Sequence, residues 1–310
     1  MIKPRPLKQG AMIGLTAPAG AADYEDVIKA VSAIKEMGFE IKIGESCYAR
    51  HGYLAGNDHQ RANELNKMFS DTSIQAIICL RGGYGTPRIL DKLDYKMIKN
   101  NPKVFIGYSD ITALHIAITQ KSELITFHGP MAASDMGKGL DDFSKQSLIR
   151  AVFHGKSKGN MTNPEGEKIG CFVEGQAVGR ITGGNLSLIA STIGTPYEID
   201  TRNKILFLED VGEEPYRIDR MLCQLLLARK LHDAAGIILG DWKQCEPEEP
   251  SKSLSLLEVF HEIICPLQKP TVFNVKAGHC SPMLTIPLGV KCSLDASIGK
   301  IEILEEATCE

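Results

Sequence analysis

Several features that mark particular protein classes are missing from this sequence. The 310 residues contain no apolar run near the roughly 20 residues that a transmembrane helix needs, so no membrane span is expected. The N-terminus lacks the apolar core and small-residue cleavage site of a signal peptide, which makes the cytoplasm the expected location. A net charge of −3 provides no broad basic field, so neither nucleic acid nor anionic lipid is an expected partner.

Metal-site spacings are missing as well. The nine cysteines stand singly, without a Cys-x-x-Cys pair, which is typical of reduced thiols that pack as small apolar residues. The eight histidines also lack a clustered ligand spacing, so zinc is not expected. No cofactor is predicted. Tryptophan occurs once, at Trp242.

The first half of the chain alternates short β-rich runs with helical stretches, a rhythm that predicts a parallel α/β sheet. The runs at 77–80 and 104–106 are apolar without alternation, as expected for strands whose two faces are both covered by helices. Ligands of such sheets bind at the carboxyl ends of the strands. The predicted strands are 11–16, 40–44, 76–80 and 104–108, and the predicted helices are 26–37 and 58–70.

The second half begins after a polar stretch rich in glycine and lysine at 136–170, which predicts a connection between domains with one helix at 142–153. We therefore expect an N-terminal α/β domain at 1–135 and a smaller α+β domain at 171–310. The strands predicted there are 176–182, 204–208, 236–239, 271–275 and 290–294, and the helices are 185–193, 217–228 and 254–264.

The segment around Ser109 predicts a strand, a tight turn and a helix. The apolar run Val104–Tyr108 ends at Ser109 and Asp110, so the Ser109 hydroxyl is expected at a strand's carboxyl end beside a helix N-terminus, whose amides suit a developing oxyanion. One interpretation is that Ser109 is a nucleophile, and the other is that Ser109 or Asp110 caps the helix. The segment lacks the second glycine of Gly-x-Ser-x-Gly, which argues against an ordinary α/β-hydrolase.

A glycine-rich stretch, Arg81-Gly82-Gly83-Tyr84-Gly85, follows another buried strand and could present backbone amides at the same sheet edge. A tight turn is the simpler interpretation. A phosphate cradle is disfavoured, because the stretch lacks the Gly-Lys-Ser/Thr ending of a P-loop and the spacing of a dinucleotide fingerprint.

Two further residues are candidates for an acid–base pair. Glu209 directly follows the apolar run Ile205–Leu208, where a buried carboxylate needs a partner such as an imidazole N–H. His279 lies in Gly278-His279-Cys280, after the strand predicted at 271–275. Spacing alone does not choose His279 from among the eight histidines.

Taken together, these segments resemble the LD-carboxypeptidase family of serine peptidases, which includes the microcin C immunity protein. The match spans nearly the whole chain, and its motifs occur in the family's order. These motifs are Thr16-Ala17-Pro18-Ala19-Gly20, Arg81-Gly82-Gly83-Tyr84-Gly85, Gly107-Tyr108-Ser109-Asp110, His128-Gly129-Pro130, Gly183-Gly184-Asn185-Leu186, Leu208-Glu209-Asp210 and Gly278-His279.

The resemblance implies a catalytic triad of Ser109 as nucleophile, His279 as general base and Glu209 as the residue that orients the histidine. It also implies a flavodoxin-like N-terminal domain that carries the serine, a C-terminal domain that carries the other two residues, and a homodimer. The amides of Gly83 and Asp110 would form the oxyanion hole. The implied activity is release of the terminal D-alanine from murein tetrapeptide during cell-wall recycling.

The sequence offers several candidates for the residues that recognise the substrate. A carboxypeptidase must bind a free carboxylate, for which Arg81 or Arg180 would serve, and Tyr84 is a further predicted substrate-binding residue. His128 is expected either to support the site or to be a packed loop residue.

Three other functions stay open. The first is an immunity-type hydrolase of peptidyl or aminoacyl adenylates. In the family that the sequence resembles, enzymes of that branch carry an added loop with an aromatic residue that stacks on the base. Residues 136–170 contain no tryptophan, which favours the murein substrate. The second is a small-molecule binding module without catalysis. The third is an amidotransferase-like enzyme that uses Cys79, although a thiol in the apolar run 77–80 is expected to be unreactive.

Overall fold

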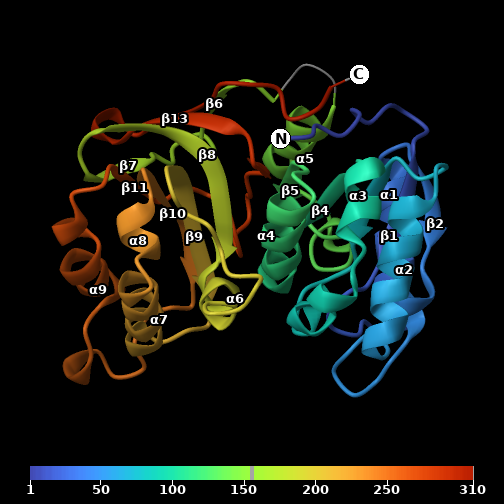
Figure 1. The fold of residues 1–310 in the computed structure, drawn as a ribbon, viewed down its shortest axis with the longest axis horizontal. Coiled ribbons are helices and arrows are strands. Elements are labelled where there is room, and N and C mark those ends of the chain that lie inside the picture. The colour runs from blue at the N-terminus through green and yellow to red at the C-terminus, as the bar shows by residue number, and fades with distance from the viewer. Residues whose placement is uncertain (154–156, 310) are drawn as a thin grey trace. The chain divides into compact units, whose positions relative to one another are not determined.

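The computed structural model describes residues 1–153 and 157–309, and the chain forms two units, each with its own sheet (Figure 1). Across the described residues, none of the helices combines the length and the apolar character that crossing a bilayer requires. The first unit consists of Met1–Ser157, Thr285–Gly289 and Glu306–Glu310, and the second of Lys158–Leu284 and Val290–Glu305.

The division between the units differs from the predicted one. The sequence indicated a connection at 136–170, but α5 (Asp142–Val152) belongs to the first unit, where the Val152 carbonyl accepts a hydrogen bond from the Leu7 amide at 3.0 Å. The return of Thr285–Gly289 to the first unit has no local sequence signal, because it depends on pairing with a strand far away in the sequence. The part of the predicted connection at 154–156 lies outside the described residues.

The first unit contains a six-stranded sheet with the order β12-β5-β4-β3-β1-β2. β1 to β5 are parallel neighbours, and their order, 2-1-3-4-5, is that of flavodoxin-like folds, so the predicted fold class is confirmed. β12 pairs antiparallel with β5 at the edge. The strands are β1 (Met12–Thr16), β2 (Glu40–Ile43), β3 (Ala76–Cys79), β4 (Val104–Gly107), β5 (Thr126–His128) and β12 (Ile286–Leu288).

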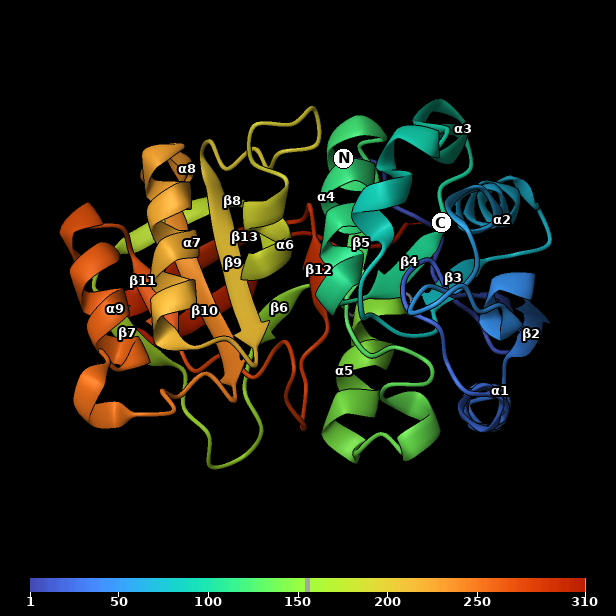
Figure 2. The same ribbon diagram turned by 90° about the horizontal axis from the view of Figure 1, so that it is seen from below.

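Helices cover both faces of this sheet, which explains the unbroken apolar sequences of β3 and β4. Figure 2 shows α2, α3 and α4 on one face and α1 and α5 on the other. Side-chain caps begin several of them: Asn57, Asp94 and Asp141 accept hydrogen bonds from the third residue along. The helices are α1 (Tyr24–Glu36), α2 (Asp58–Ser70), α3 (Tyr95–Asn100), α4 (Thr112–Lys121) and α5.

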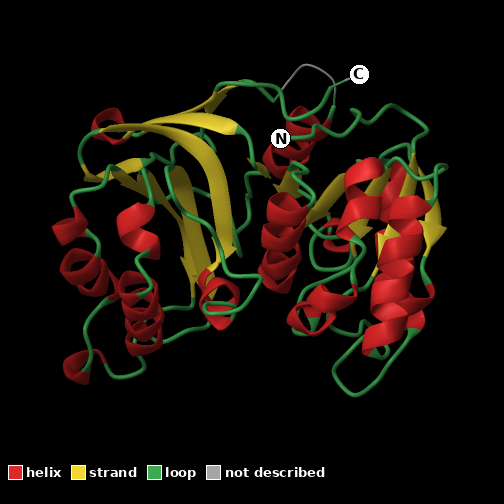
Figure 3. Ribbon diagram, in the orientation of Figure 1, coloured by secondary structure: helices red, strands yellow, loops and turns green. Residues whose placement is uncertain are grey.

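The second unit contains an eight-stranded mixed sheet with the order β6-β14-β13-β8-β9-β10-β11-β7. β8, β9, β10 and β11 are parallel, and the outer strands pair antiparallel, as the predicted α+β class requires. β8 is long and curved (Figure 3). The strands are β6 (Gly159–Met161), β7 (Gly170–Val173), β8 (Gln176–Asn185), β9 (Lys204–Val211), β10 (Gly236–Lys243), β11 (Thr271–Phe273), β13 (Lys291–Asp295) and β14 (Lys300–Ile303).

The helices of the second unit follow its parallel strands, and α7 packs against α9. α9 begins with a capping box, in which Ser255 and Glu258 satisfy each other's backbone amides. The helices are α6 (Leu186–Ser191), α7 (Pro215–Leu227), α8 (Lys230–Asp233) and α9 (Leu256–Ile263).

The β8–β9 pair depends on a glycine, which gives a first prediction. Gly183 has a φ of +129°, and an added Cβ would lie 1.9 Å from the Phe207 carbonyl oxygen. Gly183→Ala should therefore lower the free energy of unfolding by about 3 kcal/mol or more, as measured by urea denaturation. The control is Gly194→Ala, because Gly194 also has a positive φ (+83°) but has open space around it. Equal losses in the two variants would contradict the steric argument.

Candidate functional site

Ser109 occupies a strained turn directly after β4. Its φ is +62°, which lies in the left-handed region that non-glycine residues rarely adopt. The residue is partly exposed, and it opens the 3₁₀ turn Ser109–Ile111 that leads into α4. Backbone strain of this kind persists where the surrounding structure enforces it, and it is concentrated at functional sites.

The helix-cap interpretation of Ser109 and Asp110 is wrong. Tyr108 and Ile111 occupy the cap positions of the 3₁₀ turn and of α4, and neither helix has a side-chain cap hydrogen bond. The serine hydroxyl is therefore not explained by capping.

The glycine-rich segment lies against this turn. An added Cβ at Gly82 would lie 2.9 Å from the Ser109 Cβ and 3.6 Å from the Asp110 amide nitrogen, so only glycine allows this approach. Gly83 is exposed and has a φ of +108°. The structure thus brings the glycine-rich segment together with Ser109 and the Asp110 amide.

The other predicted residues of this segment lie at the surface. One Arg81 guanidinium nitrogen, Nη1, donates to the Ala21 carbonyl at 3.1 Å. Tyr84 is 47% exposed, and its ring lies 6.0 Å from that of Tyr53. Both side chains flank the glycines, which is compatible with the predicted contact to a substrate.

The Asp110 side chain is fully buried, which its local sequence does not indicate. One carboxyl oxygen, Oδ2, accepts a hydrogen bond from the Thr86 amide at 2.8 Å. Burial raises the pKa of Asp110 to about 6, although its hydrogen bonds with Thr86 act in the opposite direction.

His279 and Glu209 form a hydrogen-bonded pair in the second unit. His279 Nδ1 and Glu209 Oε2 are 2.7 Å apart. The Glu209 side chain is 0% exposed and that of His279 is 16% exposed. Burial raises the pKa of Glu209, and the hydrogen bond to His279 opposes that rise. Because the carboxylate accepts from Nδ1–H, Nε2 is the ring nitrogen that carries the lone pair.

The sequence predicted Glu209 directly after its strand, but the residue lies within β9. Its partner in the parallel register is Asn185, the last residue of β8. Gly278 explains how the histidine loop comes so close: its φ is +114°, and an added Cβ would lie 2.5 Å from Glu209 Oε2.

Two other predicted site residues, Arg180 and His128, already have partners within the structure. Arg180, on β8, forms an ion pair with Glu305 at 2.7 Å, so its guanidinium already has a carboxylate partner. His128 ends β5 and is fully buried, and its ring lies 5.7 Å from that of Tyr108. His128 therefore packs beneath the serine turn instead of lying in a loop.

Cys79 does not fit the nucleophile role of an amidotransferase-like enzyme. It is fully buried at the end of β3, and burial raises the pKa of its thiol well above the ordinary value. A thiol in this environment stays protonated and unreactive.

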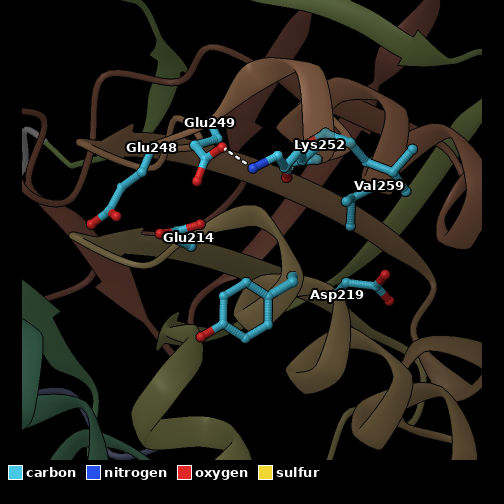
Figure 4. Close-up of a pocket in the computed structure, with 9 residues that line it drawn as sticks. Glu214, Asp219, Glu248, Glu249, Lys252 and Val259 are labelled. Atoms are coloured by element: carbon cyan, nitrogen blue, oxygen red, sulfur yellow. Dashed lines mark hydrogen bonds and ion pairs between the residues drawn. The ribbon is translucent and has the colours of Figure 1, made fainter.

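A pocket of about 400 Å³ in the second unit is lined by acidic side chains (Figure 4). Glu249 forms an ion pair with Lys252 at its rim. None of the predicted site residues lines this pocket, and over the described ranges no group of three or more His, Cys, Asp or Glu side chains is arranged to hold a metal ion. Its lining is Glu214, Tyr216, Asp219, Glu248, Glu249, Lys252, Ser253, Leu254 and Val259.

Comparison with known proteins covers both units. Residues 13–129 match the LD-carboxypeptidase N-terminal domain, and residues 178–294 match the LD-carboxypeptidase C-terminal domain. A probable murein peptide carboxypeptidase of Bacillus subtilis is 42% identical over 99% of this chain and 96% of that protein.

Solved structures agree with these matches. The microcin C7 self-immunity protein MccF, in complex with aspartyl sulfamoyl adenosine, is 28% identical with a TM-score of 0.92 over the full length of both chains. A muramoyltetrapeptide carboxypeptidase of Oxalobacter formigenes is 28% identical with a TM-score of 0.85, covering 95% of this chain and 99% of that one. Two domain matches in the family's order and a relative this similar along nearly the whole chain show that the protein belongs to the LD-carboxypeptidase family of peptidases.

Proposed function

We propose that the protein is a serine-type LD-carboxypeptidase that releases the terminal D-alanine of murein tetrapeptides, with Ser109, His279 and Glu209 as its catalytic triad. The observation that carries this proposal is a serine held at a φ of +62° after a buried parallel strand, on a chain that also holds a carboxylate-bound histidine. The Bacillus subtilis relative, named as a probable murein peptide carboxypeptidase, supports the substrate class.

The proposed reaction is acyl transfer through the serine hydroxyl. Ser109 Oγ attacks the peptide carbonyl while His279 Nε2 accepts its proton, and His279 then gives that proton to the departing D-alanine nitrogen. Glu209 holds the proton on Nδ1 and stabilises the imidazolium. Water activated by His279 then hydrolyses the acyl-enzyme, which restores Ser109.

The amides of Gly83 and Asp110 are the proposed oxyanion donors, and each such donor is worth roughly 3 kcal/mol in the transition state. Arg81 and Tyr84, which flank the glycines, are the proposed substrate contacts. Arg81 is preferred over Arg180 for the substrate carboxylate, because Arg180 is already paired with Glu305. A homodimer that acts in the cytoplasm during cell-wall recycling completes the proposal.

A second function has its own support. The similarity to MccF, solved with aspartyl sulfamoyl adenosine, favours hydrolysis of aminoacyl or peptidyl adenylates by the same triad. Both activities break an acyl bond, so the triad alone does not discriminate between them.

The substrate is tested by mass spectrometry of the products from murein tripeptide, tetrapeptide and pentapeptide, with aspartyl sulfamoyl adenosine in parallel. We expect the tetrapeptide to lose one alanine and the tripeptide and pentapeptide to stay intact. Cleavage of the sulfamoyl compound alone would replace the first proposal with the second.

The nucleophile is tested by Ser109→Ala and Ser109→Gly. Both should abolish tetrapeptide cleavage. Because alanine keeps the strain of a positive φ and glycine does not, Ser109→Gly should be about 1 kcal/mol more stable than Ser109→Ala by urea denaturation. Wild-type turnover in either variant would refute the assignment of Ser109.

The orienting carboxylate is tested by Glu209→Gln. The amide no longer stabilises the imidazolium and also accommodates the wrong histidine tautomer, so kcat should fall by about 10³–10⁴-fold. Glu198→Gln is the control, because it removes the charge of another ion-paired carboxylate of the second unit, bound to Lys230 at 2.8 Å. It should leave kcat unchanged, and similar losses in both variants would argue against a specific role for Glu209.

A further inference from the structure

Three loops converge at the carboxyl edge of the first sheet. They follow β1, β3 and β4, and the third contains Ser109. β1 and β3 are the strands at which the sheet order reverses, the place where α/β sheets bind ligands. The Gly20 amide of the first loop donates to the Gly82 carbonyl of the second at 3.1 Å. The glycine-rich segment is therefore held from one side by backbone contact.

Thr86 connects this segment to the serine turn by two hydrogen bonds. Its amide donates to Asp110 Oδ2 at 2.8 Å, and its hydroxyl donates to the Asp110 backbone carbonyl at 2.5 Å. Both residues are fully buried. Asp110 thus supplies an amide to the proposed oxyanion hole while its carboxyl and carbonyl oxygens hold the end of the glycine-rich segment.

Arg61 of α2 contacts the same segment at its last glycine, Gly85. Its Nη1 donates to the Gly85 carbonyl at 2.8 Å and to the Pro18 carbonyl at 2.5 Å, and Nη2 pairs with Asp58 Oδ1 at 2.5 Å. The Arg61 side chain is 0% exposed, and burying a guanidinium is costly unless hydrogen bonds compensate it. Two of those bonds go to loop carbonyls rather than to a carboxylate. The hydrogen bonds that offset the cost of burying the guanidinium therefore also fix the two loops.

We propose that Thr86, Asp110 and Arg61 act together as positioning residues, which hold Gly82–Gly85 against Ser109 so that the oxyanion amides are in place before the substrate arrives. This inference rests on the proposed function of Ser109 and extends it to three side chains that do not touch the reacting atoms.

The conformation of the segment explains why positioning is needed. Gly83 and Gly85 have φ values of +108° and +141°, and glycine backbones sample many other conformations when nothing restrains them. Oxyanion donors are effective only when they are preorganised, so freedom in this segment should slow the chemical step more than it weakens ground-state binding. A purely structural network would lower stability without this kinetic signature.

The decisive variant is Thr86→Val, which keeps the shape and the backbone amide but removes the hydroxyl donor to Asp110. We expect kcat for the tetrapeptide to fall about 10–100-fold with KM within about twofold of wild type. Thr86→Ser restores the hydroxyl and should recover most of the activity. Thr119→Val is the matched control, because it also removes a partly buried threonine hydroxyl, one that lies 3.4 Å from the Thr126 hydroxyl near the far end of α4.

Amide hydrogen exchange of residues 81–86 provides a readout that does not need the tetrapeptide to be the substrate. These amides should exchange at least about tenfold faster in Thr86→Val than in wild type, Thr86→Ser or Thr119→Val. If wild type leaves the tetrapeptide intact while this exchange difference is present, the proposed substrate fails and the positioning network stands. Unchanged exchange in Thr86→Val, or faster exchange with wild-type kcat, would overturn the inference.

Discussion

Ser109 has a left-handed backbone that costs a non-glycine residue about 1–3 kcal/mol, and the structure around it keeps that conformation in place. β4 is buried on both faces before the turn, and Asp110 is anchored to Thr86 after it. Gly82 approaches the serine so closely that no side chain would fit there. The turn, the glycine-rich segment and the buried anchor therefore depend on one another.

The second unit uses a different constraint, the burial of a carboxylate. Glu209 is fully enclosed, and an enclosed carboxylate is stable only with a hydrogen-bond donor. His279 supplies that donor, and the positive φ of Gly278 lets the loop come close enough for it to do so. The orientation of the imidazole thus follows from the need to satisfy a buried charge.

Local sequence signals predicted much of the first sheet and of the proposed site. α2 was predicted at 58–70 and is found there, because its apolar stripe and the capping Asn57 are both local features. β5 and β12 were missed, since each has only three residues and they pair across a large sequence separation. Glu209 was placed after its strand, because a charged residue in a buried strand contradicts the apolar pattern that marks strands.

Arg61 and Thr86 were missed for a related reason. A helix arginine is usually solvated, although Arg61 shares the buried stripe of α2 with Ala62 and Leu65, and that spacing was a usable signal. Thr86 gave no such signal, because its partner Asp110 is 24 residues away. The residues proposed to contact the reacting atoms stand in short motifs, whereas the hydrogen bonds of the proposed positioning residues join segments that are far apart in the sequence. Positioning residues must therefore be sought among buried polar side chains whose hydrogen bonds end on motif backbones.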